Sequence, residues 1–245
     1  MTTRRAALKY LVGMAGVPAL AGLGFAGNPN EREVKPEANV LDPDRIGKDT
    51  NLWVFDFKFK DPRIIKLGVP GRGEKVCWYL WYQVINNTGK PQFLIPDFEW
   101  VTLDTKKTFR DQILPRVQEE IRKIEDPNDQ LKIKNSVTIA ATAIPPSREN
   151  AEPIAVTGVA IWDDIDPESN HFSIFIQGLS NGWALTDDPA EPGKKTVVRR
   201  KTLQLNFKRL GDQYYQKSEE IRFQGPATWD YRASKLNIAN LNLPK

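Results

Sequence analysis

The segment from Gly178 to Gly182 reads GLSNG and holds the first candidate for catalysis, Ser180. Its G-x-S-x-G spacing can place a nucleophilic serine on a sharp turn between a strand and a helix. A strand-like stretch precedes Ser180, but the residues after it are rich in Gly and Pro, so no helix is predicted to follow. The serine also needs a base, and the only histidine, His171, lies nine residues upstream, about 30 Å away along an extended strand. The sequence therefore predicts a turn, with a hydrolase using Ser180 as the weaker alternative.

Cys77 and His171 are a second nucleophile and base, because a thiol beside an imidazole can be activated as a thiolate. Cys77 lies inside an aromatic strand-like stretch, where a free cysteine usually packs as a small apolar side chain. As the only cysteine, it can form no disulfide within the chain. We predict no catalytic residue and no cofactor.

An acidic stretch before His171 has oxygen ligands at every second position, which is a spacing found in calcium loops. The ligands would come from Asp164, Asp166, Glu168 and Asn170. Ser169 stands where such a loop needs glycine, and the closing glutamate is absent. We predict a connecting loop and no metal site, with calcium as the ion that these hard ligands would choose.

Basic residues gather between positions 194 and 209 without one acid, and the binding candidates among them are Lys194, Lys195, Arg199, Arg200 and Lys201. Such a stretch can bind anionic envelope polymers or phospholipid headgroups through its summed positive potential. The alternative is a solvated strand whose charges discourage edge pairing, and this alternative is favoured. Residues 1–26 hold three of the 35 Lys and Arg and no acid, leaving 32 basic against 31 acidic residues. Because this balance is nearly neutral, we predict no nucleic-acid partner.

Tyr79 and Trp81 lie on the opposite phase of a predicted strand from Trp78 and Tyr82. If one face of that strand is open, Tyr79 and Trp81 form a flat aromatic platform of the kind that suits sugars. Because the strand is apolar on both phases, burial of both faces is the favoured interpretation.

The first 26 residues are typical of an export signal, with Arg4, Arg5 and Lys9 before an apolar stretch that ends near Ala26. Residues 3–9 resemble the twin-arginine motif, except that alanine replaces the usual phenylalanine at position 7. The resemblance implies export of a folded protein to the periplasm or cell envelope. We expect cleavage after Ala21 or Ala26. An uncleaved membrane anchor is the alternative, although the stretch is shorter than the roughly 20 apolar residues of a spanning helix.

The remaining chain divides into a flexible linker over residues 27–50, one domain over 51–232 and a polar tail over 233–245. Alternating apolar residues predict strands over much of the domain, and a repeat of apolar groups predicts one amphipathic helix over 113–124. The predicted strands are 52–60, 76–91 with a closing turn at Asn87 and Gly89, 92–104, 136–144, 154–162, 171–179, 202–209 and 219–225. We therefore predict an all-β fold: a single antiparallel, immunoglobulin-like β-sandwich with one inserted helix.

Several segments also resemble known exported proteins. The stretch YQVINNTGKPQFLIP is similar to the strand-turn-strand of immunoglobulin-like modules in bacterial exported proteins. Together with VAIWDDIDP, GLSNGW and KTLQLNF, it makes the chain resemble uncharacterised exported proteins of planctomycete-type bacteria over most of residues 51–232. The resemblance implies location and fold and carries no known activity.

These observations predict an exported, non-catalytic β-sandwich that binds or scaffolds a component of the cell envelope. Its partner is an anionic polymer, a glycan or an envelope protein, and it touches the membrane only through an uncleaved signal segment. An extracytoplasmic carbohydrate-binding module is the alternative.

Overall fold

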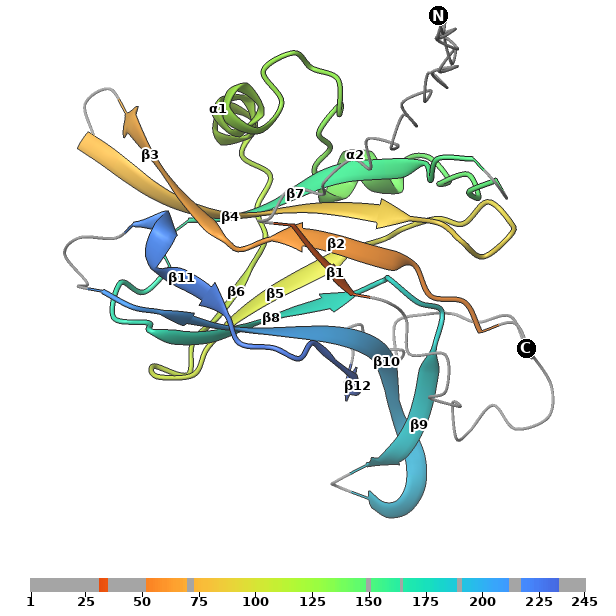
Figure 1. The fold of residues 1–245 in the computed structure, drawn as a ribbon. Helices are drawn as coiled ribbons and strands as arrows, with labels where there is room; N and C mark the ends of the chain where they lie inside the picture. The colour runs from red at the N-terminus through yellow and green to blue at the C-terminus, as the bar shows by residue number, and fades with distance from the viewer. Residues whose placement is uncertain are drawn as a thin grey trace, which may run out of the picture.

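Two antiparallel sheets pack face to face and form most of the molecule (Figure 1). The structure, a computed structural model, describes residues 31–34, 52–69, 73–148, 151–163, 165–188, 191–211 and 217–233. The antiparallel β-sandwich predicted from the sequence is confirmed, although the described residues contain two α-helices where one was predicted.

The first sheet has five strands arranged around one long central strand. Its strands are β1 (Glu31–Val34), β2 (Asp56–Lys60), β3 (Arg63–Val69), β4 (Gly73–Ile85) and β7 (Ala155–Asp163). β7 pairs with one edge of β4, while β2 and β3 follow one another along the other edge. β1 then pairs with the far edge of β2.

The second sheet has seven strands, and β10 is its longest. Its strands are β5 (Asp97–Thr102), β6 (Thr108–Arg110), β8 (His171–Gln177), β9 (Trp183–Asp188), β10 (Glu191–Arg209), β11 (Ile221–Phe223) and β12 (Thr228–Ala233). β8 joins β10 to β5, and β6 pairs with the outer edge of β5. β9 and the first half of β10 form a hairpin that projects from the sandwich (Figure 1).

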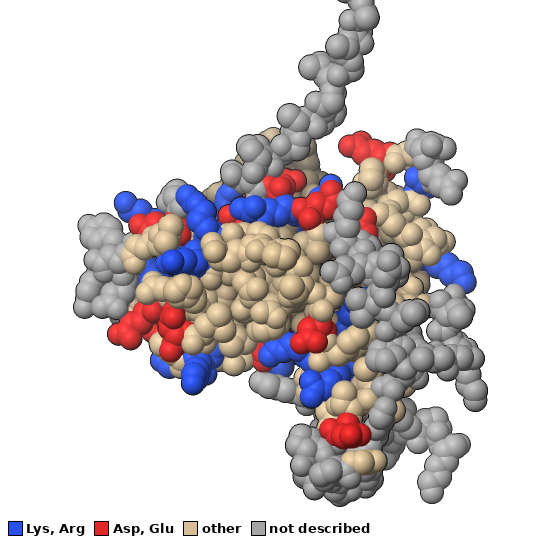
Figure 2. Space-filling view, turned by 60° about the horizontal axis from the view of Figure 1, so that its bottom comes forward, with Lys and Arg blue, Asp and Glu red and all other residues tan. Residues whose placement is uncertain are grey.

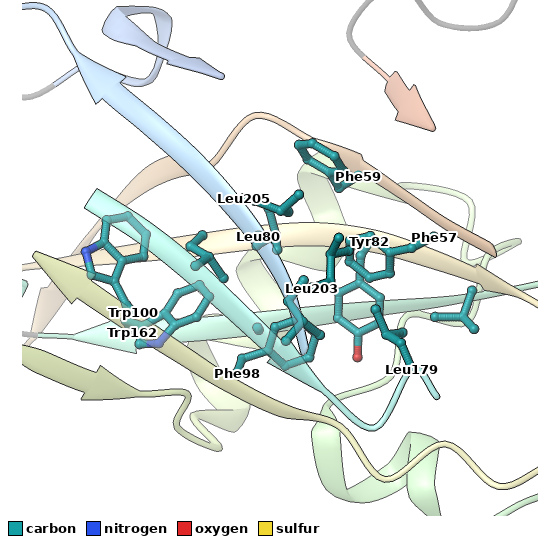
Figure 3. Close-up of a cluster of buried hydrophobic side chains, with 14 of the residues drawn as sticks. Phe57, Phe59, Leu80, Tyr82, Phe98, Trp100, Trp162, Leu179, Leu203 and Leu205 are labelled. Carbon is teal, nitrogen blue, oxygen red and sulfur yellow. The ribbon is translucent and has the colours of Figure 1, made fainter. Parts of the chain in front are cut away.

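The core between the sheets is built from large aromatic and aliphatic side chains (Figure 3). The alternation predicted for residues 52–60 and 171–179 is present, because Phe57 and Phe59 point inward from β2, and Phe172 points inward from β8. The ring of Trp100 stacks on Phe172 with centroids 3.9 Å apart. Burial of such large apolar surfaces is the main stabilising term of the fold.

The outer face of β4 is also covered, as the apolar residues on both of its phases predict. Helix α1 (Pro115–Glu125) packs Val117 and Ile121 over this face. Tyr79 and Trp81 lie beneath the helix, each with 2% of its surface exposed. The hypothesis that Tyr79 and Trp81 form an open platform for sugars is therefore wrong, because α1 occupies the place where a ligand would stack.

Residues 136–144 do not form the predicted strand, because their first half is helix α2 (Ser136–Ala140). The side chain of Asn135 accepts hydrogen bonds from the backbone N–H groups of Val137 and Thr138, and the Thr138 hydroxyl accepts one from Asn135 N–H. This reciprocal cap starts a helix where the alternating apolar residues predict a strand. A 3-10 helix, η1 (Ser218–Glu220), precedes β11.

The segment predicted as a flexible linker over residues 27–50 contains β1, and the rest of it lies outside the described residues. Arg32 of β1 donates two hydrogen bonds to the Asp61 carboxylate, at 2.8 and 3.0 Å. This pair fixes the short strand at the sheet edge. The predicted tail beyond Ala233 lies outside the described residues. No helix in the described part of the chain is long and apolar enough to cross a membrane.

Candidate functional site

Ser180 lies in a turn after β8, as predicted, and its hydroxyl is used to hold that turn. Ser180 Oγ donates to the backbone oxygen of Trp53 at 2.8 Å and accepts from Gly182 N–H at 3.0 Å. His171 begins β8 and Ser180 follows its end, so the full length of the strand separates them. In this arrangement His171 is not placed to act as the base for Ser180.

Cys77 and His171, the other candidate nucleophile and base, lie in different environments. Cys77 is fully buried beneath α1, whereas His171 is exposed and lies 3.2 Å from an oxygen of Asp104. The same carboxylate accepts the backbone N–H of His171 and of Asn170, and these bonds lower the pKa of Asp104. Asp104 therefore fixes the backbone at the start of β8.

The acidic stretch forms a loop in which Asp166 and Asn170 bind the protein's own cations. Asp166 accepts from Lys107 Nζ at 2.7 Å, which lowers the pKa of Asp166, and Asn170 accepts from Arg209 at 3.1 Å. Asp164 lies outside the described residues. Within the described ranges, no group of three or more His, Cys, Asp or Glu side chains could hold a metal ion.

The basic stretch is divided between the two faces of β10, so it does not form one surface. Lys201 points inward, is 1% exposed and lies 5.4 Å from the ring centroid of Trp229. Arg199 donates to the Thr186 hydroxyl at 2.9 Å, and Arg200 is exposed on the opposite phase. The prediction that Lys201 is a surface binding residue is therefore wrong, because the alternation of β10 points its side chain into the core. The side chains of Lys194 and Lys195 lie outside the described part of the structure.

A buried ionic network lies between α1 and the outer face of the first sheet. The Glu125 carboxylate, only 2% exposed, accepts from Lys60 Nζ at 3.0 Å, Arg63 at 2.7 Å and the Tyr79 hydroxyl at 2.9 Å. Lys60 Nζ also lies 4.2 Å from the ring centroid of Trp81. Burial, together with the Glu125 charge, raises the pKa of Tyr79, so its phenol remains a donor. The network links the C-terminal end of α1 to β2, β3 and β4 and holds the helix on the sheet.

An open site is found on the outer face of the second sheet, which Figure 2 turns toward the viewer. A broad field of uncharged residues is bordered there by Lys, Arg, Asp and Glu side chains. A shallow hollow of about 70 Å³ lies on this face, which we call the outer-face hollow. It is lined by Asp97, Glu99, Arg110, Phe175, Gln177, Arg232 and Ala233.

Strand register explains how these side chains meet. Asp97 and Glu99 alternate with the buried residues Phe98 and Trp100, so both acids point away from the core. Across the sheet, Glu99 pairs with Phe175 of β8, and Asp97 pairs with Gln177.

Two ion pairs organise the outer-face hollow. Arg110 donates to Asp97 at 2.5 Å, and this bond raises the pKa of Arg110. Arg232 lies 3.0 Å from Glu99 and places its guanidinium 3.5 Å above the Phe175 ring centroid. The hollow therefore offers guanidinium donors, carboxylate acceptors and the Gln177 amide within one small space.

A second hollow, of about 260 Å³, lies at the base of the β9–β10 hairpin. It is lined by Asn181, Trp183, Val198 and Arg200 and is mostly apolar. The Asn181 side chain accepts from Trp53 N–H at 2.9 Å as part of the Ser180 turn. This hollow combines a predicted binding residue, Arg200, with few groups that could orient a polar ligand.

Sequence reasoning missed the residues of the outer-face hollow. The acids at positions 97 and 99 lie within the predicted strand 92–104, and their alternation with Phe98 and Trp100 was the available signal. Arg232 had no such signal, because β12 was not predicted. Only the strand pairing brings β5 and β12 to the same face.

One titration prediction follows from Asp111, a residue next to the core. Burial raises the pKa of Asp111 above its ordinary value of 3.8, and a hydrogen bond from the Ser136 hydroxyl offsets part of this rise. The unfolded state has the ordinary pKa and the folded state has the raised one. At pH values between the two, folded Asp111 keeps a proton that unfolded Asp111 has lost, so the free energy of unfolding falls as pH rises. We expect Asp111→Asn to remove that fall and to leave the protein at least as stable at pH 7.

Urea unfolding at several pH values between about 4 and 7 measures the effect of Asp111→Asn. Asp129→Asn is the matched control, because an exposed pair with Lys132 lowers the pKa of Asp129. The contribution of Asp129 therefore has the opposite sign, and it is lost as pH falls. If the stability of Asp111→Asn depended on pH in the same way as that of the wild type, burial would not disfavour the charged form of Asp111, and the prediction would be wrong.

Comparisons with known protein families, with characterised proteins and with solved structures find no match to this chain.

Proposed function

We propose that this protein is an exported, non-catalytic β-sandwich that binds a component of the cell envelope through the outer face of its second sheet. The basic and apolar character of residues 1–26 supports export. The observation that carries the binding proposal is the outer-face hollow, where paired charges and a ring lie open on a sheet face. Binding sites typically combine a concave surface with a few converging polar groups of this kind.

The alternative functions have weaker support. A hydrolase using Ser180 would need a base near it, and its hydroxyl bonds the Trp53 carbonyl instead. A carbohydrate-binding module using Tyr79 and Trp81 would need those rings exposed. An anionic polymer on the basic stretch would need its charges on one face, and Lys201 is buried.

Isolation from the host tests export and binding together. We expect the native mass of the protein to lack residues 1–21 or 1–26, and the protein to sediment with purified host envelopes. Glu99→Gln should weaken this sedimentation, because it breaks the pair that holds Arg232. Glu119→Gln is the matched control, since it breaks an exposed pair with Arg122 on α1, at the opposite side of the sandwich. An unprocessed cytoplasmic protein, or equal sedimentation of both variants, would contradict the proposal.

A further inference from the structure

The donors and acceptors of the outer-face hollow indicate the chemistry of its ligand. Arg232 is held on two sides, by the Glu99 carboxylate and by the Phe175 ring. Its Nη1 atom is buried and has no hydrogen-bond partner among the described residues. The Arg232 side chain as a whole is 30% exposed and lines the hollow, so its guanidinium is the donor that the hollow offers to an oxygen atom of a bound molecule.

The charges of the hollow disfavour an anionic ligand. Each guanidinium is already paired with a carboxylate, Arg110 with Asp97 and Arg232 with Glu99. The two positive and two negative charges cancel, and a phosphate or carboxylate would meet both acids at close range. A hydroxyl group avoids this repulsion, because it can accept from a guanidinium and donate to a carboxylate at once.

The size and surroundings of the hollow favour one unit of a longer molecule. Its volume of about 70 Å³ is well below the roughly 300–1,000 Å³ of a pocket that encloses a whole small molecule. Beside it, Gln204 and Asn206 on the same face of β10 carry uncharged amides that hydrogen bond at 2.7 Å. A chain with many hydroxyl groups can lie on this face and insert a hydroxyl pair into the hollow.

We propose that the outer-face hollow is a subsite for an uncharged saccharide, an inference that rests on the proposed binding function. The Arg232 guanidinium donates to one sugar hydroxyl oxygen, and the carboxylates of Asp97 and Glu99 accept from that hydroxyl and its neighbour. Arg232 is thereby the residue that determines specificity. Lysine cannot replace it, because an ammonium lacks the planar fork that bonds Glu99 and a ligand together.

Calorimetric titration of the exported protein tests this subsite. The probes are the neutral hexasaccharides of glucose in α-1,4 and β-1,4 linkage, of mannose and of N-acetylglucosamine, with hexagalacturonate as the anionic counterpart. We expect at least one neutral probe to bind and hexagalacturonate to bind less tightly. Arg232→Lys should lower the affinity for the neutral probe about tenfold, because one charge-assisted hydrogen bond is lost.

Two controls make the outcome unambiguous. Asp97→Asn changes a side chain that is 38% exposed, so it should fold normally and still weaken binding. Arg122→Lys, on α1, should leave affinity unchanged. Tighter binding of hexagalacturonate, or full affinity in both hollow variants, would overturn the saccharide subsite. If no probe binds while host envelopes still do, the subsite fails and the proposed function stands; if the envelopes also fail to bind, the proposed function fails.

Discussion

Glu125→Ala is expected to lower the free energy of unfolding by about 3–5 kcal/mol, as removal of one member of a buried ionic group typically does. The carboxylate accepts from Lys60, Arg63 and Tyr79, and its loss leaves three donors without their shared acceptor. Arg63 is partly exposed and can turn toward water, but the Lys60 side chain is 10% exposed and lies against the Trp81 ring. The Lys60 charge therefore accounts for most of the loss.

Chemical denaturation of the purified protein measures this effect. Glu120→Ala is the matched control on the same helix, since its pair with Lys123 is exposed. Such a surface pair typically contributes less than about 1 kcal/mol. A loss below about 1 kcal/mol in Glu125→Ala would mean that the network does not hold α1 on the sheet.

Gly178→Ala is expected to destabilise the protein by about 3 kcal/mol, from backbone strain and overpacking together. Gly178 has a φ of +93°, a conformation that side chains other than glycine rarely adopt. A Cβ atom there would also lie 2.1 Å from the backbone oxygen of Ile95. Because the obstacle is backbone, it cannot be relieved by turning a side chain, and the β8 turn must move.

Thermal and urea unfolding of Gly178→Ala test this prediction against Ser180→Ala. The control removes two hydrogen bonds in the same turn, one to the Trp53 carbonyl and one from Gly182 N–H, and each typically contributes about 1 kcal/mol. Equal stability of Gly178→Ala and the wild type would show that this turn does not require a left-handed glycine.

The strands of the core could be predicted because their side chains alternate with the period of a pleated strand. Phe57 and Phe59 in β2 alternate with the half-buried Asp56 and Lys58. β4 has apolar residues on both phases, and both of its faces are covered, one by the second sheet and one by α1. Local periodicity sufficed here, because burial depends mainly on which phase a residue occupies.

Capping and remote pairing limited what the sequence could predict. In residues 136–144 the cap at Asn135 starts a helix against the alternating pattern. β1 is a polar segment that becomes a strand only because it pairs with β2 and binds Asp61 through Arg32. Neither effect produces an apolar period, which was the signal used to predict strands.

The candidate site depended on pairing between distant strands. The basic stretch of β10 is continuous in sequence, but its alternation sends Lys201 into the core and Arg200 to the surface. The outer-face hollow shows the opposite case, since Asp97 and Arg232 are far apart in sequence and line the same space. A contiguous charged segment can therefore divide between two faces, while scattered residues assemble into one site.

Hydrogen exchange with mass spectrometric detection, on the purified protein with and without soluble host envelope glycan, tests the binding face most directly. Binding at this face predicts slower exchange of backbone amides in β5, β8 and β12, with no change in α1 or β7. Arg232→Lys should abolish that protection. Protection confined to α1 and β7, or equal protection in the variant, would contradict binding at the outer face of the second sheet.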